Sequence, residues 1–192
     1  MMTKAELRTE LLRRRASLSQ QQLDAAGSAI ADRIERIDAV RTARSIALYL
    51  SMTPEPPTWA LADRLRERGV GVLTPLVRSG RRLEWAEYAG RERLRAAAYG
   101  ISEPATPPRG VQAIGDVDAV VLPALAVDRL GHRLGRGAGY YDRALAYASP
   151  VAARIAVVYD DELVARLPTE DHDEPVHLVV TPERTWCCTG PE

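Results

Sequence analysis

The sequence Asp-Ala-Val-Val-Leu-Pro-Ala-Leu at residues 118–125 decides the fold class of this chain. Its near-continuous Val and Leu content is typical of a strand that is buried on both faces of a sheet. Apolar runs of the same type lie at residues 45–51, 70–75, 153–159 and 176–181. Because segments with a helical pattern separate most of these runs, the order predicts an α/β protein, a three-layer α/β/α fold with a mostly parallel central sheet.

The segments between the apolar runs complete the predicted order of elements. We expect a hairpin over residues 78–88, a helical turn and a long surface connection over 89–115, a helix over 142–147 and a short helix near 161–165. No repeat, low-complexity tract or linker interrupts the sequence. We therefore expect a single domain over residues 1–184 and a C-terminal tail over residues 185–192.

Charge and composition argue against several classes of protein. The 26 basic side chains balance 26 acidic ones, which argues against a dedicated nucleic-acid-binding protein. No apolar run approaches the roughly 18 residues that a membrane-spanning helix needs, and the N-terminus lacks the apolar stretch of a secretion signal. The two cysteines, Cys187 and Cys188, are adjacent, so they supply no disulfide framework. We expect a cytoplasmic monomer without a membrane or nucleic-acid partner.

The N-terminal segment predicts a helix that carries two cations on one face. Thr3 and Glu6 have the spacing of a capping box, which places Lys4, the single lysine of the chain, at the first helical position. Arg8 lies one turn further on and projects from the same face. Two such cations normally belong to a solvated face, and a bound anion is the alternative. We interpret the run at residues 13–15, Arg-Arg-Arg, as solvated surface.

The densest chemistry lies at residues 131–143, Gly-His-Arg-Leu-Gly-Arg-Gly-Ala-Gly-Tyr-Tyr-Asp-Arg. Four glycines in nine residues let backbone amides approach a ligand closely, and the helix expected next adds its positive N-terminal dipole. Arg133 and Arg136 supply planar cations suited to phosphate. The segment lacks the Gly-Lys-Ser/Thr of a Walker A loop and the last glycine of the dinucleotide fingerprint. A phosphate site is favoured over the alternative, a surface turn with incidental arginines.

Three acidic residues are candidates for ligand binding. Asp142 follows the glycine-rich segment and Asp173 lies in an acidic loop, and such carboxylates near phosphate suit Mg²⁺, although a helix cap and a solvated turn remain alternatives. Glu55 lies beyond the carboxyl end of the strand at residues 45–51, where α/β sheets bind ligands, and is a candidate to read the substrate, with an ordinary loop charge as the alternative. The three histidines have no serine or cysteine in a nucleophile setting, so we predict no catalytic triad.

The segment at residues 131–143 resembles the signature of the 5-formyltetrahydrofolate cyclo-ligase family, also called methenyltetrahydrofolate synthetases. Weaker landmarks occur in the order of that family over nearly the whole chain. They are Lys-x-x-x-Arg at residues 4–8, Glu-x-x-Thr at 55–58, Tyr-Gly-Ile-x-Glu-Pro at 99–104, the strand at 118–123, Pro168, the pair His172 and Asp173, and Val-Val-Thr at 179–181.

The resemblance implies an ATP- and Mg²⁺-dependent conversion of 5-formyltetrahydrofolate to 5,10-methenyltetrahydrofolate, with release of ADP and phosphate. By analogy, the formyl oxygen accepts the γ-phosphoryl group to form an iminium phosphate, N10 closes on the activated carbon, and phosphate leaves. Such a reaction requires positioning and neutralisation of phosphate charge rather than an enzyme nucleophile, which agrees with the missing triad. The implied partners are therefore small molecules.

The resemblance also assigns roles to residues of this chain. The implied catalytic residues are Lys4, Arg136 and Tyr140. The implied ATP site consists of Lys4, Arg8, Arg133, Leu134, Gly135, Arg136, Gly137, Ala138, Gly139, Tyr140 and Tyr141. The implied folate site consists of Leu50, Glu55, Arg136, Gly137, Ala138, Gly139 and Tyr140. The implied Mg²⁺ ligands are Asp142 and Asp173.

Several positions depart from the family pattern, among them Pro54, Pro56 and Pro57, which make the Glu55 loop stiffer than usual, and two other functions stay open. Ala138 stands where the family often has Gly or Lys, and His177 where an acidic residue is common. The alternatives are a nucleotide- or folate-binding relative without catalysis and another ATP-dependent phosphotransferase on the same scaffold. Retention of Lys4, Glu55 and Arg136, together with both carboxylates of the implied metal site, favours the cyclo-ligase over the first alternative.

Overall fold

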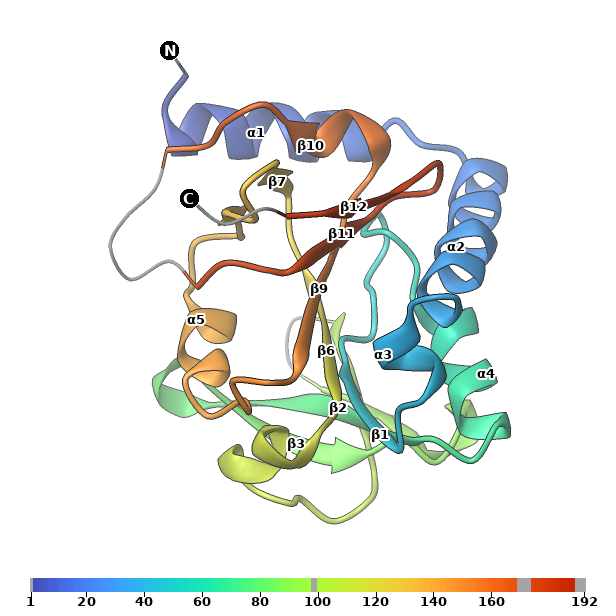
Figure 1. Ribbon diagram of the computed structural model, residues 1–192. Coiled ribbons are helices and arrows are strands. Elements are labelled where there is room, and N and C mark those ends of the chain that lie inside the picture. The colour runs from blue at the N-terminus through green and yellow to red at the C-terminus, as the bar shows by residue number, and fades with distance from the viewer. Residues whose placement is uncertain (1, 98–99, 169–173, 189–192) are drawn as a thin grey trace.

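The computed structural model describes residues 2–97, 100–168 and 174–188, and a seven-stranded sheet forms its centre (Figure 1). Its strands are β1 (Ser45–Leu48), β2 (Gly71–Arg78), β3 (Arg82–Glu87), β6 (Ala119–Pro123), β9 (Ala153–Val157), β11 (Leu178–Val180) and β12 (Thr185–Cys187). Their order is β12-β11-β9-β6-β1-β2-β3. The four inner pairs are parallel and the two edge pairs, β2–β3 and β11–β12, are antiparallel. The predicted mostly parallel α/β sheet is confirmed.

Helices cover both faces of this sheet, which confirms the three layers. The helices are α1 (Lys4–Arg15), α2 (Gln20–Glu35), α3 (Asp38–Arg41), α4 (Trp59–Glu67) and α5 (Tyr140–Leu145). Alternate strand residues point to opposite faces. Val121 and its neighbours pack with α2 and α4 in one core cluster, whereas Val120 and its neighbours pack with α5 and the 3₁₀ segment η4 (Val111–Asp116) in a second cluster.

The predicted capping box at Thr3, and a second one at Ser19, fix where the first two helices begin. Before α1, the Glu6 backbone amide donates to Thr3 Oγ1 (3.3 Å), and the Thr3 amide donates to Glu6 Oε2 (2.8 Å). Ser19 and Gln22 make the same pair of contacts before α2. Each box satisfies amide donors that the first helical turn leaves unpaired.

Helix α1 lies with a small sheet beyond the carboxyl ends of the central strands (Figure 1). This sheet has the order β10-β7-β8 and consists of β7 (Ala126–Asp128), β8 (Arg133–Leu134) and β10 (Leu163–Val164). Leu11 of α1 packs against Leu125, Leu134 and Leu167 in a third core cluster. Residues that follow β6 and β9 therefore provide the surface on which α1 is held.

Several predicted connections contain more structure than expected. Residues 185–187, which we expected to begin a tail, form the edge strand β12, because Trp186 packs on the core and its indole Nε1 donates to Arg129 O (3.3 Å). The glycine-rich segment at residues 131–143 contains the short strand β8. The surface connection after β3 contains η2 (Arg91–Arg93) and the paired strands β4 (Leu94–Ala96) and β5 (Ser102–Pro104).

Two predicted helices also differ in the structure. The helix expected over 142–147 is α5 and begins earlier, at Tyr140, because Gly139 has a φ of 68° and serves as a left-handed N-cap. The helix expected near residue 161 is replaced by the 3₁₀ turn η5 (Asp160–Glu162) followed by β10. The hairpin predicted for residues 78–88 is confirmed as β2, the turn η1 (Ser79–Arg81) and β3.

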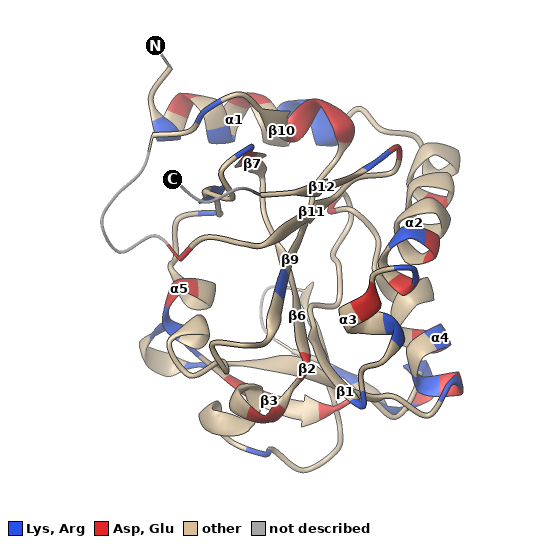
Figure 2. Cartoon of the chain, viewed as in Figure 1, with Lys and Arg blue, Asp and Glu red and all other residues tan. Residues whose placement is uncertain are grey.

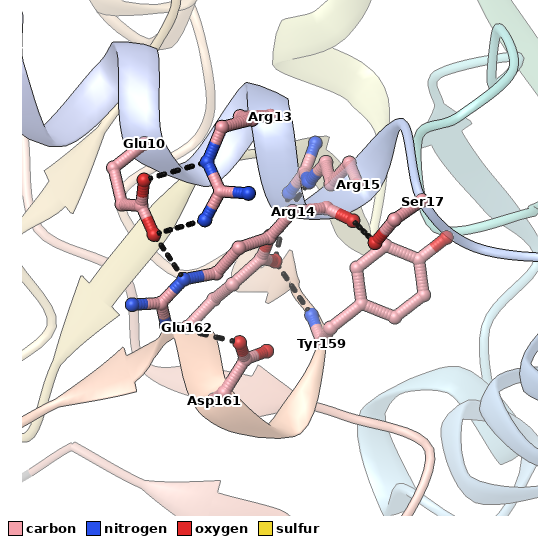
Figure 3. A network of polar contacts seen from close by, with 8 residues as sticks. All are labelled: Glu10, Arg13, Arg14, Arg15, Ser17, Tyr159, Asp161 and Glu162. Atoms are coloured by element: carbon pink, nitrogen blue, oxygen red, sulfur yellow. Dashed lines mark hydrogen bonds and ion pairs between the residues drawn. The ribbon is translucent and has the colours of Figure 1, made fainter.

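The interpretation of residues 13–15 as solvated surface is wrong for one arginine. Arg13 and Arg14 are exposed and pair with Glu10, as expected of a solvated face (Figure 3). Arg15 is 2% exposed and forms two contacts of 2.7 and 2.8 Å with the carboxylate of Glu162. A buried guanidinium needs such a partner, because an unpaired charge in the interior costs several kcal/mol.

Charges of both signs are interspersed on the helices, in agreement with the balanced composition (Figure 2). Helix α1 carries acidic and basic side chains along its length, and Glu10 pairs within it to Arg13 and Arg14. Within the described residues, no helix is long and apolar enough to span a membrane.

Candidate active site

The glycine-rich segment is anchored at its start by a buried carboxylate. Asp128 is fully buried, and its Oδ1 accepts the backbone amides of Leu130 and His132, each at 3.0 Å. Its Oδ2 accepts the amide of Leu167 (3.1 Å) and contacts His132 Nδ1 (3.0 Å). Because four donors converge on one carboxylate, the segment starts from a fixed conformation and is not the loose turn considered as the alternative. Sequence analysis did not identify Asp128.

Helix α1 contacts the middle of the same segment. Arg8 Nε donates to the carbonyl oxygen of Gly135 (2.9 Å), across 127 residues of sequence. Gly137 has a φ of 98°, and a Cβ at this position would lie 3.5 Å from the Arg8 guanidinium. Lys4 begins α1 one turn before Arg8, on the same side of the helix. The two predicted ATP-binding elements are therefore adjacent.

A second contact joins the segment to the loop after β1. Arg136 Nη2 lies 3.0 Å from Glu55 Oε1. Glu55 is 8% exposed, and its Oε2 accepts the backbone amide of Met52 (3.0 Å). Glu55, predicted to bind the folate, and Arg136, predicted to contact phosphate, are thus in direct contact. Leu50, the other folate residue predicted outside the glycine-rich segment, is buried in the core beneath this loop.

The loop that carries Glu55 is held by reciprocal hydrogen bonds. Thr58 Oγ1 donates to Tyr49 O (2.7 Å) and accepts the Ser51 amide (3.1 Å), and Ser51 Oγ accepts the Thr58 amide (3.1 Å). All three residues are buried. A buried hydroxyl that is both donor and acceptor fixes the loop ends against the end of β1. The Glu-x-x-Thr spacing at residues 55–58 was only a family landmark in the sequence, which did not predict these hydrogen bonds.

A cavity of about 340 Å³ adjoins the Glu55 loop. Its lining includes Ser51, Glu55 and Trp59, together with residues of α2 and α4. A second cavity of about 330 Å³ is lined by Asp116, Asp118 and their neighbours, at the amino ends of the central strands. Ligands of open α/β sheets bind beyond the carboxyl ends of the strands, which favours the cavity at Glu55 as part of the site.

Arg133 and Asp142 form a pair inside the segment. Arg133 Nη2 donates to Asp142 Oδ1, the Arg133 side chain is 5% exposed, and within the described residues its buried Nε has no hydrogen-bond partner. Asp142, the carboxylate predicted to bind metal, is therefore paired with the guanidinium of Arg133 in this structure. Within the same residues, no three His, Cys, Asp or Glu side chains are grouped as a metal site, and Asp173 lies outside the described residues.

The two tyrosines of the segment pack on the hydrophobic core. Tyr141 contacts both main core clusters, and Tyr140 contacts the one that contains α5. Burial, and secondarily the negative charge of Glu55, raises the pKa of Tyr141 well above its usual value. The Tyr141 phenol is therefore protonated at any working pH and can act only as a neutral group.

Comparison with known proteins decides the family. A model of the 5-formyltetrahydrofolate cyclo-ligase family matches residues 1–182. The chain belongs to this family. The 5-formyltetrahydrofolate cyclo-ligase of Mycolicibacterium smegmatis is 39% identical over 187 residues, which cover 95% of each chain. The cyclo-ligase of Escherichia coli K12 is 31% identical over 176 residues, which cover 90% of this chain and 97% of the relative.

Solved structures agree with the cyclo-ligase assignment. The NMR structure of Aquifex aeolicus 5,10-methenyltetrahydrofolate synthetase has a TM-score of 0.83 at 26% identity and covers 100% of this chain and 95% of that one. A synthetase from Mycoplasma pneumoniae, 20% identical with a TM-score of 0.76, covers 95% and 100% and supports the fold alone. The family and the enzyme class predicted from residues 131–143 are confirmed, and the individual site residues stay predictions.

Proposed function

We propose that this cyclo-ligase uses ATP to convert 5-formyltetrahydrofolate into 5,10-methenyltetrahydrofolate, with release of ADP and phosphate. The contact between Arg136 and Glu55 carries the proposal, because it joins the glycine-rich segment to the loop beyond β1. Arg136 can then contact both Glu55, the carboxylate predicted to bind the folate, and the phosphoryl group that is transferred. Family membership supplies the substrate class.

The proposed chemistry proceeds through a phosphorylated formyl group. The formyl oxygen attacks the γ-phosphorus, and the bond from that phosphorus to the bridging oxygen breaks, which releases ADP. N10 then attacks the activated carbon, the carbon–oxygen bond breaks, N10 loses its proton, and phosphate departs with the former formyl oxygen. Both steps depend on alignment and on stabilisation of phosphate charge, so the enzyme needs no nucleophile of its own.

The geometry supports a division of labour around the transferred group. Lys4 and Arg8 on α1, with the amides around Gly137 and Gly139, would bind the ATP phosphates. Glu55 would accept hydrogen bonds from the N–H groups of the pterin ring. Arg136 would turn from Glu55 towards the phosphoryl group as charge develops.

The donor set of the segment fits Mg²⁺ in the form that accompanies ATP. Mg²⁺ commonly takes one or two carboxylates and completes its shell with phosphate oxygens and water. Asp142 offers a carboxylate beside the glycine-rich segment, and Asp173 is the predicted second ligand. The ion would neutralise charge on the ATP phosphates. Arg133, the present partner of Asp142, would then be available for the same phosphates.

The formation of methenyltetrahydrofolate absorbance tests the proposed function. Purified protein, 5-formyltetrahydrofolate, ATP and Mg²⁺ should give turnover, and omission of ATP should abolish it. Binding of ATP and folate without turnover would establish the non-catalytic alternative instead. A monomeric state and a cytoplasmic location stay predictions, which size-exclusion chromatography with light scattering and cell fractionation would test.

A further inference from the structure

Two tyrosines hold the loop that carries Glu55 from opposite sides. Tyr49, directly after β1, donates its hydroxyl hydrogen to the carbonyl oxygen of Pro56 (2.8 Å). Tyr159, shortly after β9, donates to the carbonyl oxygen of Pro54 (3.2 Å). The two accepting carbonyls belong to the residues on either side of Glu55. The position of Glu55 therefore depends on hydroxyl groups from two different strands.

The two tyrosines differ in what supports them. Glu162 Oε2 accepts the backbone amide of Tyr159 (2.7 Å), and the guanidinium of Arg15 lies over the Tyr159 ring, 5.5 Å from its centre (Figure 3). Arg15 and Glu162 are themselves joined by two charged hydrogen bonds, and Arg15 Nη2 also donates to Ala124 O (2.6 Å). Tyr159 is thus fixed at its amide, its ring and its hydroxyl.

This arrangement places the two predicted ligand-binding groups at the ends of one chain of contacts. Arg15 ends helix α1, and Arg8, about two turns earlier, contacts the glycine-rich segment. From Arg15 the contacts run through Tyr159 to Pro54 and the Glu55 loop. A helix transmits such a constraint because its backbone hydrogen bonds keep its residues in fixed relative positions. Tyr49 donates its hydroxyl hydrogen to Pro56, and the Arg15 charge acts on its phenol, but among the contacts of the described residues no hydrogen bond or ring contact joins Tyr49 to Arg15.

The buried pair of Arg15 and Glu162 is a costly way to attach a helix. Both side chains are removed from water, and an apolar pair of similar volume often stabilises a fold as well or better. The charged pair fixes the relative orientation of Arg15 and Glu162, because a bidentate guanidinium–carboxylate contact allows only a narrow range of geometries. This favours a role in positioning over a role in stability alone.

We propose that Tyr159 is a positioning residue that couples nucleotide binding at α1 to folate binding at Glu55. The proposal rests on the proposed function, since it assigns ATP to α1 and folate to Glu55. Phosphate binding at Lys4 and Arg8 restrains α1, Arg15 restrains Tyr159, and the Tyr159 hydroxyl orders the Glu55 loop. Folate then binds a loop that is already ordered, and linkage requires that folate strengthen nucleotide binding by the same factor.

The test compares two variants that each lose one hydroxyl group. The dissociation constant of 5-formyltetrahydrofolate is measured by titration calorimetry with and without a non-hydrolysable ATP analogue, for the wild type, Tyr159→Phe and Tyr49→Phe. The ratio of the two constants is the coupling factor. We expect a factor of about 5 or more in the wild type, the lower end of typical allosteric coupling. Tyr159→Phe should bring it close to 1, whereas Tyr49→Phe should weaken folate binding equally in both conditions.

The outcomes separate this proposal from the proposed function. A wild type that does not bind folate or nucleotide would contradict the proposed function itself. A wild type that binds both ligands with a factor of 1 would overturn the coupling, as would a Tyr159→Phe variant that keeps the wild-type factor. Equal loss of the factor in both variants would show that the loop, and not Tyr159, carries the effect, and would also overturn the proposal.

A second variant tests the connection through Arg15. The double substitution Arg15→Met and Glu162→Gln removes both charges but leaves an acceptor for the Tyr159 amide, so no buried charge is left unpaired. We expect the double variant to bring the coupling factor close to 1, as Tyr159→Phe does. Adding Tyr159→Phe to the double variant should lower the coupling factor no further. Thermal unfolding checks that each variant is folded. Full coupling in a folded double variant would exclude the route through α1.

Discussion

Arg136 lies 3.0 Å from Glu55, so the segment predicted to bind nucleotide and the loop predicted to bind folate contact each other directly. The contact is asymmetric. The Glu55 side chain is 9% exposed, whereas that of Arg136 is 48% exposed and can move without leaving solvent. Because Glu55 is buried and Arg136 is half-exposed, Arg136 can leave Glu55 when a substrate binds to this carboxylate.

Replacement of Glu55 by Gln should weaken folate use selectively. The substitution removes the charge but keeps the shape, and a hydrogen bond to a charged group contributes about 1.5–3 kcal/mol. We therefore expect kcat/KM for 5-formyltetrahydrofolate to fall by roughly 10- to 100-fold, with little change in KM for ATP. Glu84→Gln, which removes a carboxylate paired with Arg78 on the β2–β3 hairpin, is the control. If KM for ATP rose as much as KM for 5-formyltetrahydrofolate, the assignment of Glu55 to folate would be contradicted.

Replacement of Gly137 by Ala should impair nucleotide binding. A positive φ disfavours residues with a Cβ by about 1–2 kcal/mol. Any backbone shift that relieves this strain at residue 137 would displace the segment where it contacts Arg8. We expect a several-fold increase in KM for ATP and a modest decrease in melting temperature. Gly69→Ala is a matched control, since Gly69 also has a positive φ (79°) but a Cβ there would meet nothing within 4 Å. The control should lose stability and keep its KM for ATP.

Replacement of Asp142 by Asn tests the proposed Mg²⁺ ligand. The variant should need a higher Mg²⁺ concentration for half-maximal turnover, and ATP should bind with less dependence on Mg²⁺ in calorimetric titrations. Loss of the negative charge that balances the buried Arg133 should also lower stability, by about 1–3 kcal/mol. Asp161→Asn, which alters an exposed carboxylate at the other end of α1, should change neither property. An unchanged Mg²⁺ requirement in Asp142→Asn would exclude it as a ligand.

Local patterns in the sequence predicted local structure well. The capping box at Thr3 predicted where α1 begins, because it depends on residues only three positions apart. Residues 118–125 identified the central strand for a similar reason, since a continuous apolar run needs both faces of a sheet covered. Lys4 and Arg8 were placed on one helix face by the same short-range logic.

Features that depend on distant residues could not be predicted in the same way. Arg13, Arg14 and Arg15 have the same side chain, and only the last meets Glu162, which lies 147 residues further along the chain. The sequence predicts a tail where β12 lies, because the pairing of β12 with β11 and the packing of Trp186 are tertiary contacts. Glu55 and Arg136 were each candidates, but nothing in either segment predicted that they would touch.

The two adjacent cysteines should differ sharply in reactivity. Burial raises the pKa of the Cys188 thiol to about 11, with smaller contributions from Asp128 and Cys187, whereas Cys187 is exposed. Since the thiolate is the reactive form, about one Cys188 in a thousand is ionised at pH 8, and its rate should rise about tenfold per pH unit up to pH 10. Thiol labelling of Cys187→Ser and Cys188→Ser, each with one cysteine, separates the two rates. Labelling of Cys188 at pH 8 as fast as that of Cys187 would show that β12 opens readily from the sheet edge, because the Cys188 thiol is only partly exposed while the edge strand is paired.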